Sequence, residues 1–301
     1  MMKKILAILI TISIQSTLVF CQTGQQDFPK LSGPYLGQNP PGNKPEVFAP
    51  GIVSTELYNH CTISVSPDGT EIYWAAGLLD APRRIYFSVN ENGMWRQPEI
   101  VPFTKSEDGD CPVLSPDGKK MFFNSNRPIT KGGSRRERIW CVERTSKNWG
   151  DPFCLNVEIN DEHLHWQVSV DNKENLYFGS ERIGSKGKDD IFFAEFLNGG
   201  YAKAYSLGSE INTEFLESTP YISPDGGYLI FSREELYISY KKEDGSWTRS
   251  RSLGSDFRKA FCPYVSPDGK YLFFLKMGMG YNDIYWVSAK IIEDLRSSGC
   301  P

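Results

Sequence analysis

Short apolar runs separated by polar turns recur along most of the chain, in a pattern that favours β-strands over helices. The run 111–114, for example, leads into a Ser-Pro-Asp-Gly turn at 115–118, and a second β-prone run follows at 120–123. Proline at the second turn position and glycine at the fourth favour a tight reversal of the chain. The pattern therefore predicts pairs of short antiparallel strands.

This strand-turn-strand pattern is repeated. Complete Ser-Pro-Asp-Gly turns begin at Ser66, Ser115, Ser223 and Ser266, and a degenerate copy begins at Ser169. The repeat is therefore about 50 residues long, a length typical of one propeller blade. Each copy continues with a variable loop and a third strand, which contains Ile85, Ile139, Ile191, Leu236 or Ile284. In the first four copies an aromatic residue then opens a fourth strand: Trp95, Trp149, Tyr201 or Trp247.

Four short strands in a meander cannot bury both of their faces, so the units must pack against one another. We therefore predict an all-β chain with a single β-propeller of about five four-stranded blades over residues 45–290. The fifth unit lacks its fourth strand, and residues 45–48 resemble the strand at 98–101, so an N-terminal strand should close the last blade and remove the sheet edges. A sixth blade would have to lie within residues 22–45, which are rich in Pro, Gly and Gln.

The Ser-Pro-Asp-Gly repeats over roughly 45–290 resemble the TolB-type, WD-repeat-like β-propeller family of exported bacterial proteins. The third unit departs from the pattern, with Val170 in place of Pro and Asn172 in place of Gly. The resemblance implies a fold more than a function, since such propellers serve as binding platforms, accessory domains and occasionally enzymes.

The N-terminus predicts export. Lys3 and Lys4 precede an uncharged apolar run, 5–20, which is shorter than the roughly 20 residues of a membrane-spanning helix. We predict a signal peptide over 1–21, an extended lead-in over 22–44 and a C-terminal tail over 291–301, with no transmembrane segment after cleavage. The mature chain would be periplasmic or extracellular. Lipidation of Cys21 is the alternative, although Phe20 is bulky for that signal.

The composition excludes several classes of protein. With 13% aromatic residues the chain is not a disordered polyampholyte. A formal net charge of -4, from 33 basic and 37 acidic residues, argues against a nucleic-acid partner. Six cysteines follow Cys21. Some of them could form disulfides in an exported protein, or they could pack as small buried hydrophobes, and the sequence does not specify which, if any, are bonded. They are Cys61, Cys111, Cys141, Cys154, Cys262 and Cys300.

All three histidines fall in the crossings, the segments that connect the fourth strand of one blade to the innermost first strand of the next. These crossings share one face of the predicted propeller with the long loops between second and third strands. His60, His163 and His165, with Gln167, would ring the mouth of the channel as a metal or polar-ligand site. The alternative is that they are rim histidines paired with nearby acids, and no metal or other cofactor is then required. Cys61, Cys111 and Cys262 also lie near this mouth, as packing residues or as thiol ligands.

Two neighbouring loops on the same face are basic and rich in glycine. Their candidate ligand-binding residues are Arg127, Arg135, Arg136, Arg182 and Lys186. Such loops could hold an acidic polysaccharide or the acidic patch of a protein, or they could simply be solvated.

No hydrolase elbow, phosphate loop or dinucleotide fingerprint occurs in the sequence. The favoured function is therefore an exported binding platform for a protein or glycan in the cell envelope, without catalysis. The alternative is a carbohydrate-active enzyme, a hydrolase or a metal-assisted lyase, with its site at the channel mouth. The sequence leaves the oligomeric state open.

Overall fold

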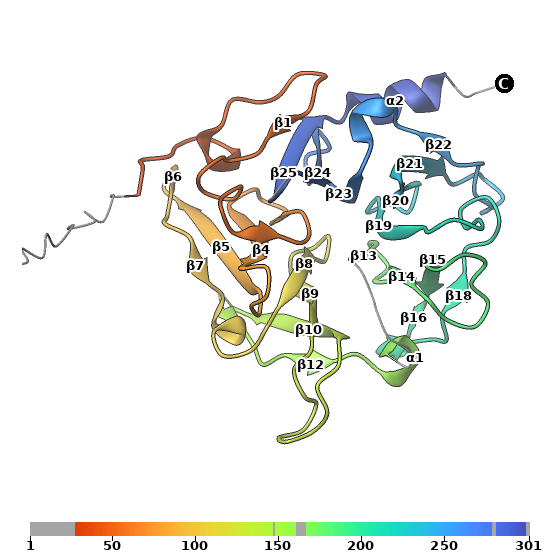
Figure 1. Cartoon of the computed structure of the whole chain (residues 1–301), viewed down its shortest axis with the longest axis horizontal. Helices are drawn as coiled ribbons and strands as arrows, with labels where there is room; N and C mark the ends of the chain where they lie inside the picture. The colour runs from red at the N-terminus through yellow and green to blue at the C-terminus, as the bar shows by residue number, and fades with distance from the viewer. Residues whose placement is uncertain (1–27, 147, 161–166, 279–280, 299–301) are drawn as a thin grey trace, which may run out of the picture.

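The computed structural model describes residues 28–146, 148–160, 167–278 and 281–298. Over these residues the chain is an all-β propeller, in which five small antiparallel sheets form a ring (Figure 1). The predicted fold class and the count of five blades are confirmed.

Each blade is a meander whose first strand lies innermost. Blade one consists of β3 (Ser64–Val65), β4 (Glu71–Gly77), β5 (Arg84–Glu91) and β7 (Glu99–Ile100). Blade two consists of β8 (Asp110–Leu114), β9 (Lys120–Ser125), β10 (Arg138–Thr145) and β12 (Phe153–Cys154). Blade three consists of β13 (Val168–Val170), β14 (Leu176–Ser180), β15 (Asp190–Ala194) and β18 (Tyr205–Ser206). Blade four consists of β19 (Ser218–Ile222), β20 (Tyr228–Arg233), β21 (Glu235–Tyr240) and β22 (Arg251–Ser252). Blade five consists of β23 (Ala260–Val265), β24 (Tyr271–Met277), β25 (Asn282–Ser288) and β1 (Glu46–Val47).

Short accessory elements extend these blades. The extra strands are β2 (Tyr58–Asn59), β6 (Met94–Trp95), β11 (Asn148–Trp149), β16 (Phe196–Leu197) and β17 (Gly200–Tyr201). The helices are η1 (Tyr35–Gly37), η2 (Pro102–Thr104), α1 (Val157–Asn160), η3 (Ser255–Phe257) and α2 (Lys290–Ser297). In the part of the chain that the structure describes, no helix has the length and apolar character needed to cross a membrane.

The core lies between neighbouring blades, because adjacent residues of a strand point to opposite faces of its sheet. In β9, Phe122 packs toward blade three and Phe123 toward blade one. In β4 of blade one, Tyr73 likewise packs toward blade two and Trp74 toward blade five. Two bulky apolar residues in succession on each second strand thus supply both interfaces of a blade.

The Ser-Pro-Asp-Gly turns are held by their own side chains. In the first, Ser66 Oγ donates to Asp68 Oδ1 at 2.6 Å, and the amide of Thr70 donates to the same oxygen at 3.0 Å. Gly69 has a φ of 72°, which a residue with a Cβ rarely adopts. These hydrogen bonds outweigh partial burial and lower the pKa of Asp68. The aspartates of the turns are therefore structural.

The third unit forms the same turn two residues later than the sequence pattern predicts. The amide of Glu174 donates to the carbonyl of Asp171 at 3.0 Å, and Glu174 has a φ of 63°. Asp171 thus stands where the other turns have serine. The turn predicted at 169–172 is wrong, because Ser169 belongs to β13 and its hydroxyl accepts a hydrogen bond from Ile222 of blade four.

The N-terminal strand closes the ring, as predicted. In β1, Glu46 pairs with Trp286 and Val47 pairs with Tyr285 of β25 (Figure 1). Phe48 follows this strand and is fully buried, with its ring centroid 5.1 Å from that of Phe273. The last blade is therefore built from both ends of the propeller sequence.

The segments on either side of the propeller pack against it. Before the closing strand, Tyr35 is buried against Tyr271 and Trp286, and its hydroxyl donates to Asp268 at 3.1 Å. After the last blade, the side chain of Ile292 in α2 is buried against blades four and five. The backbone carbonyl of Ile292 accepts a hydrogen bond from the Tyr240 hydroxyl at 2.6 Å.

Candidate functional site

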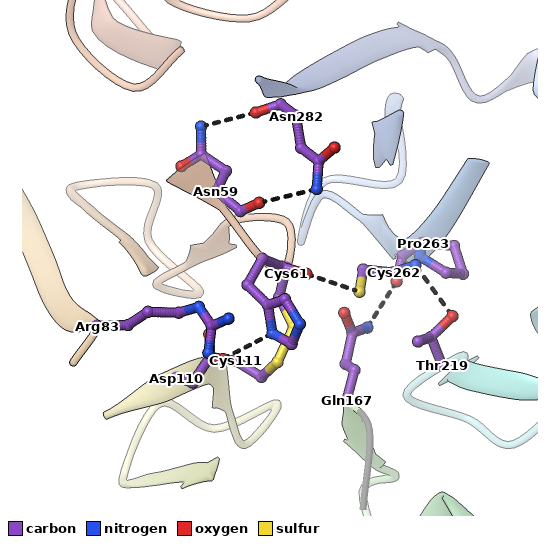
Figure 2. The surroundings of a disulfide bond; sticks show 11 residues. Asn59, Cys61, Arg83, Asp110, Cys111, Gln167, Thr219, Cys262, Pro263 and Asn282 are labelled. Atoms are coloured by element: carbon purple, nitrogen blue, oxygen red, sulfur yellow. Dashed lines mark hydrogen bonds and ion pairs between the residues drawn. A yellow bond between two sulfur atoms is a disulfide. The ribbon is translucent and has the colours of Figure 1, made fainter. Parts of the chain in front are cut away.

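The mouth of the channel is the candidate site, and it is formed where the chain enters the five innermost strands. The blades contribute Cys61, Cys111, Gln167, Thr219 and Cys262, which Figure 2 shows around one centre. These residues lie on the face of the long loops, as the meander predicts.

His60 and Arg83 converge on one buried carboxylate at this mouth. His60 Nδ1 lies 2.7 Å from Asp110 Oδ2, and Arg83 Nη1 lies 3.1 Å from the same oxygen. Burial alone would raise the pKa of Asp110, but the hydrogen bond from His60 and the electrostatic attraction of His60 and Arg83 outweigh it and lower that pKa. The site therefore presents an ionised, nearly inaccessible carboxylate beneath two partly exposed nitrogen-bearing side chains.

A disulfide joins blades one and two beside this carboxylate. Cys61 and Cys111 form the bond, with their Cα atoms 5.1 Å apart (Figure 2). Cys262 of blade five keeps a free thiol, which donates weakly to the carbonyl of His60 at 3.7 Å. Burial, the largest cause, and nearby Asp110 raise the pKa of this thiol. Cys262 is thus a protonated packing residue here.

Gln167 seals the channel below the mouth. It comes from blade three, yet its Nε2 donates to the carbonyl of Pro263 in blade five at 2.9 Å, so the side chain crosses the channel (Figure 2). Thr219 Oγ1 accepts a hydrogen bond from the amide of Cys262 at 3.0 Å. Gln167 Oε1 is buried and has no hydrogen-bond partner among the described residues.

The channel beneath this seal is small and largely apolar. Its cavity measures about 250 Å³ and includes the side chains of Ile63, Tyr221 and Tyr264, with turn prolines such as Pro67 and Pro267 at the opposite end. Small-molecule sites usually occupy about 300–1,000 Å³. The cavity is therefore slightly smaller than a typical small-molecule site, which favours the outer face for a larger ligand.

Two of the predicted basic side chains are tied into the fold. Arg127 donates to the carbonyls of Phe103 and Asp108, and its guanidinium stacks 5.0 Å from the ring centroid of Phe123. Arg182 makes the equivalent contacts in blade three, with the carbonyl of Ile159 and the ring of Phe178. Each arginine thus fastens a crossing to the second strand of its blade.

The other three predicted cations are more accessible or only partly engaged. Arg135 is exposed and pairs with Glu107 at 3.0 Å, whereas Arg136 donates to the carbonyl of Asn160. Lys186 is exposed, and its backbone amide donates to Asp190 Oδ2. His163 and His165 lie outside the described residues, so the predicted grouping of three histidines stays a prediction.

The loop face also carries exposed apolar side chains that the sequence reasoning missed. Of the thirteen large apolar residues that are exposed in the described chain, nine lie on this face, in its loops and crossings or, for Met277, at the end of β24. They are Leu78, Leu79, Ile129, Val157, Ile183, Phe215, Leu216, Met277 and Tyr281. Ile183 is 96% exposed. The sequence does contain a signal for this exposed surface. These apolar residues stand among Gly, Pro and charged residues in long loops, where burial in an alternating strand does not account for them.

Two of the segments that carry these exposed apolar residues are held together through their backbones. The amide of Glu217 donates to the carbonyl of Asp189 at 2.9 Å, which joins the loop of blade three to the following crossing. At Gly187, a Cβ atom would lie only 1.7 Å from the carbonyl oxygen of Phe215. Glycine therefore allows the loop that carries Ile183 to pack directly against the crossing that carries Phe215.

Comparisons with known proteins support the fold. No family model matches the chain, and no curated protein matches its sequence. A solved structure assigned as TolB from Agrobacterium tumefaciens is similar, with a TM-score of 0.51 and 15% identity over 78% of each chain. TolB from Acinetobacter baumannii matches with a TM-score of 0.48 and 16% identity over 75% of this chain, which spans 53% of that protein. A gluconolactonase from Xanthomonas campestris matches with a TM-score of 0.45 and 11% identity, over 86% of this chain and 97% of that one. At these identities the similarity extends to the β-propeller fold, distantly related in shape to TolB propeller domains, and to no particular activity.

Proposed function

We propose that the protein is an exported binding platform, whose loop face docks a protein partner in the cell envelope. The observation that carries this proposal is that nine of the thirteen exposed large apolar side chains of the described chain lie on one face, with Ile183 and Phe215 on two segments in direct contact. Exposed apolar patches on soluble proteins typically mark an interaction site.

The chemistry of the face favours a protein over a glycan. Seven of the nine residues are aliphatic or methionine, whereas sugar rings are usually bound by stacking on aromatic faces. Exposed cations, among them Lys131, Arg135, Lys186 and Lys188, lie in the same loops. The complementary partner therefore presents an apolar surface bordered by acidic side chains.

Site-specific photo-cross-linking tests this function. A photoreactive amino acid at Ile183, on the loop face, should yield a discrete adduct with one envelope protein. The same amino acid at Leu197, which is 49% exposed in a hairpin on the opposite face, should not. The double substitution Ile129→Asp and Ile183→Asp should weaken binding of the identified partner by roughly 30-fold or more, as expected for hot-spot residues. Equal adducts from both faces would contradict the proposal.

The second candidate function is a carbohydrate-active enzyme at the channel mouth, and the contact between His60 and Asp110 favours it. A histidine held 2.7 Å from a buried carboxylate has the arrangement of a general base and its orienting acid. This candidate requires turnover of a glycan that His60→Ala abolishes while the fold is preserved. A platform without catalysis instead shows partner binding that does not depend on His60.

A further inference from the structure

Four metal-binding side chains meet where blades one and two join. His60, Cys61, Asp110 and Cys111 each offer one ligand atom, and all four atoms lie within 4.8 Å of one another. The residues come as two adjacent pairs, one at the entry to each innermost strand. This cluster differs from the predicted grouping of three histidines, since it combines one imidazole with a carboxylate and two sulfur atoms.

We propose that the chain, once the disulfide between Cys61 and Cys111 is reduced, binds one zinc ion through these four residues. Zinc prefers four ligands in a tetrahedral arrangement, with sulfur, nitrogen and carboxylate oxygen as its usual donors. Bond lengths of about 2.0–2.3 Å place such ligand atoms roughly 3.3–3.8 Å from one another. All four atoms lie within 4.8 Å of one another, and the two sulfur atoms, bonded in the oxidised protein, have to separate to this spacing after reduction.

The disulfide form is converted to the zinc-bound form in two steps, reduction and then metal binding. A dithiol or phosphine reductant supplies two electrons, the solution supplies two protons, and the disulfide becomes two thiols. Zinc then displaces both thiol protons and binds the sulfur atoms as thiolates. The Cα atoms of the two cysteines are 5.1 Å apart, so the sulfur atoms can separate by side-chain rotation while the strands remain in place.

The charges around the cluster suit a divalent cation. Two thiolates and the carboxylate of Asp110 carry three negative charges, and zinc neutralises two of them. The guanidinium of Arg83, 3.1 Å from Asp110 Oδ2, offsets the third. Cys61, Cys111 and Asp110 are buried, whereas the side chain of His60 is 25% exposed and gives the ion a route from solvent.

Zinc would replace the covalent link between the blades with a coordinate one. The disulfide connects residues 50 positions apart, one in the crossing that leads into β3 and one in β8. Its reduction should lower the thermal midpoint of unfolding, and zinc should restore much of that loss because it binds only the folded arrangement. Stability therefore reports on the site independently of any catalytic activity.

The experiment compares oxidised and phosphine-reduced full-length protein, in titrations with zinc alone or with cobalt as a spectroscopic substitute. We expect the reduced protein to bind about one equivalent, with a thiolate-to-cobalt charge-transfer band and a raised thermal midpoint. The oxidised protein should show neither. His60→Ala and Asp110→Asn should weaken binding at least about tenfold, and Cys61→Ser should remove the two-thiolate spectrum.

Cys141→Ser is the matched control, because Cys141 is also a buried cysteine but lies in β10 with a free thiol. It should leave metal binding unchanged. The proposal is overturned if oxidised protein binds cobalt as tightly as reduced protein does, if Cys141→Ser reduces binding as much as Cys61→Ser, or if His60→Ala leaves the affinity intact. Should Cys61→Ser fail to fold, His60→Ala still decides the matter, since it retains both cysteines.

Discussion

Closure of the ring by the N-terminal strand predicts that Phe48→Ala destabilises the whole propeller. Phe48 has no exposed surface, and its ring lies 5.1 Å from that of Phe273 and 5.2 Å from that of Trp286. Loss of a buried Phe side chain costs about 3 kcal/mol in transfer free energy, and the two aromatic contacts add roughly 0.5–1.5 kcal/mol each. The sum, about 4–6 kcal/mol, overlaps the upper part of the 3–5 kcal/mol typical of buried Phe→Ala substitutions, and we take about 4–5 kcal/mol.

A loss of this size should lower the melting temperature of a domain of this length by roughly 10–15 °C, at about 3 °C per kcal/mol. The assay is thermal unfolding followed by circular dichroism, with urea denaturation for the free energy. Phe153→Ala is the control: Phe48 directly follows the fourth strand of its blade, Phe153 lies in the fourth strand of another blade, β12, and Phe153 is 45% exposed. Equal melting temperatures for the two variants would refute the role assigned to the closing strand.

Three further predictions concern the channel mouth and its neighbouring loop. Replacing Cys61 and Cys111 together by Ala should lower the free energy of unfolding by about 4 kcal/mol in urea denaturation, the loop-closure value for a 50-residue separation. The lowered pKa of Asp110 means that its contribution to stability is fully present above the unfolded pKa of about 3.9 and is lost as the pH falls through the folded pKa. Asp110→Asn should therefore be less stable at pH 7 and should show a smaller difference between pH 7 and pH 3 than the parent protein. Gly187→Ala should unfold at a lower temperature, because its Cβ would meet a backbone oxygen at 1.7 Å, whereas Gly200→Ala, with no atom within 4 Å, should not.

Local patterns carried most of the fold prediction. A Ser-Pro-Asp-Gly turn is stabilised by its own hydroxyl, carboxylate and glycine, so it forms wherever those residues occur in order. The turn of the third unit was predicted two residues too early, because Asp171 and Glu174 make the same turn with other residue types. Closure by residues 45–48 was also predictable, since they resemble a fourth strand and the last blade lacked one.

The candidate site was less predictable, because its contacts join residues that are far apart in sequence. His60 was identified from its position in a crossing, but Asp110 and Arg83 became its neighbours only through the packing of blade one on blade two. Arg127 and Arg182 are basic loop residues by sequence, yet backbone carbonyls of the crossings lie within reach of both guanidinium groups.

The sequence by itself determined the blade, its repeat and the closing strand, since these depend on turn chemistry and on alternation within about ten residues. The tertiary structure decided which cysteines bond, which cations remain free and which apolar residues stay exposed. Cys61, Cys111 and Cys262 are similar in sequence position, but only the first two form a disulfide, while Cys262 keeps its thiol. Likewise, Ile183 is an ordinary apolar residue in the sequence, and only the folded chain shows that its side chain is 96% exposed. Such outcomes follow from distances between blades, which no local pattern specifies.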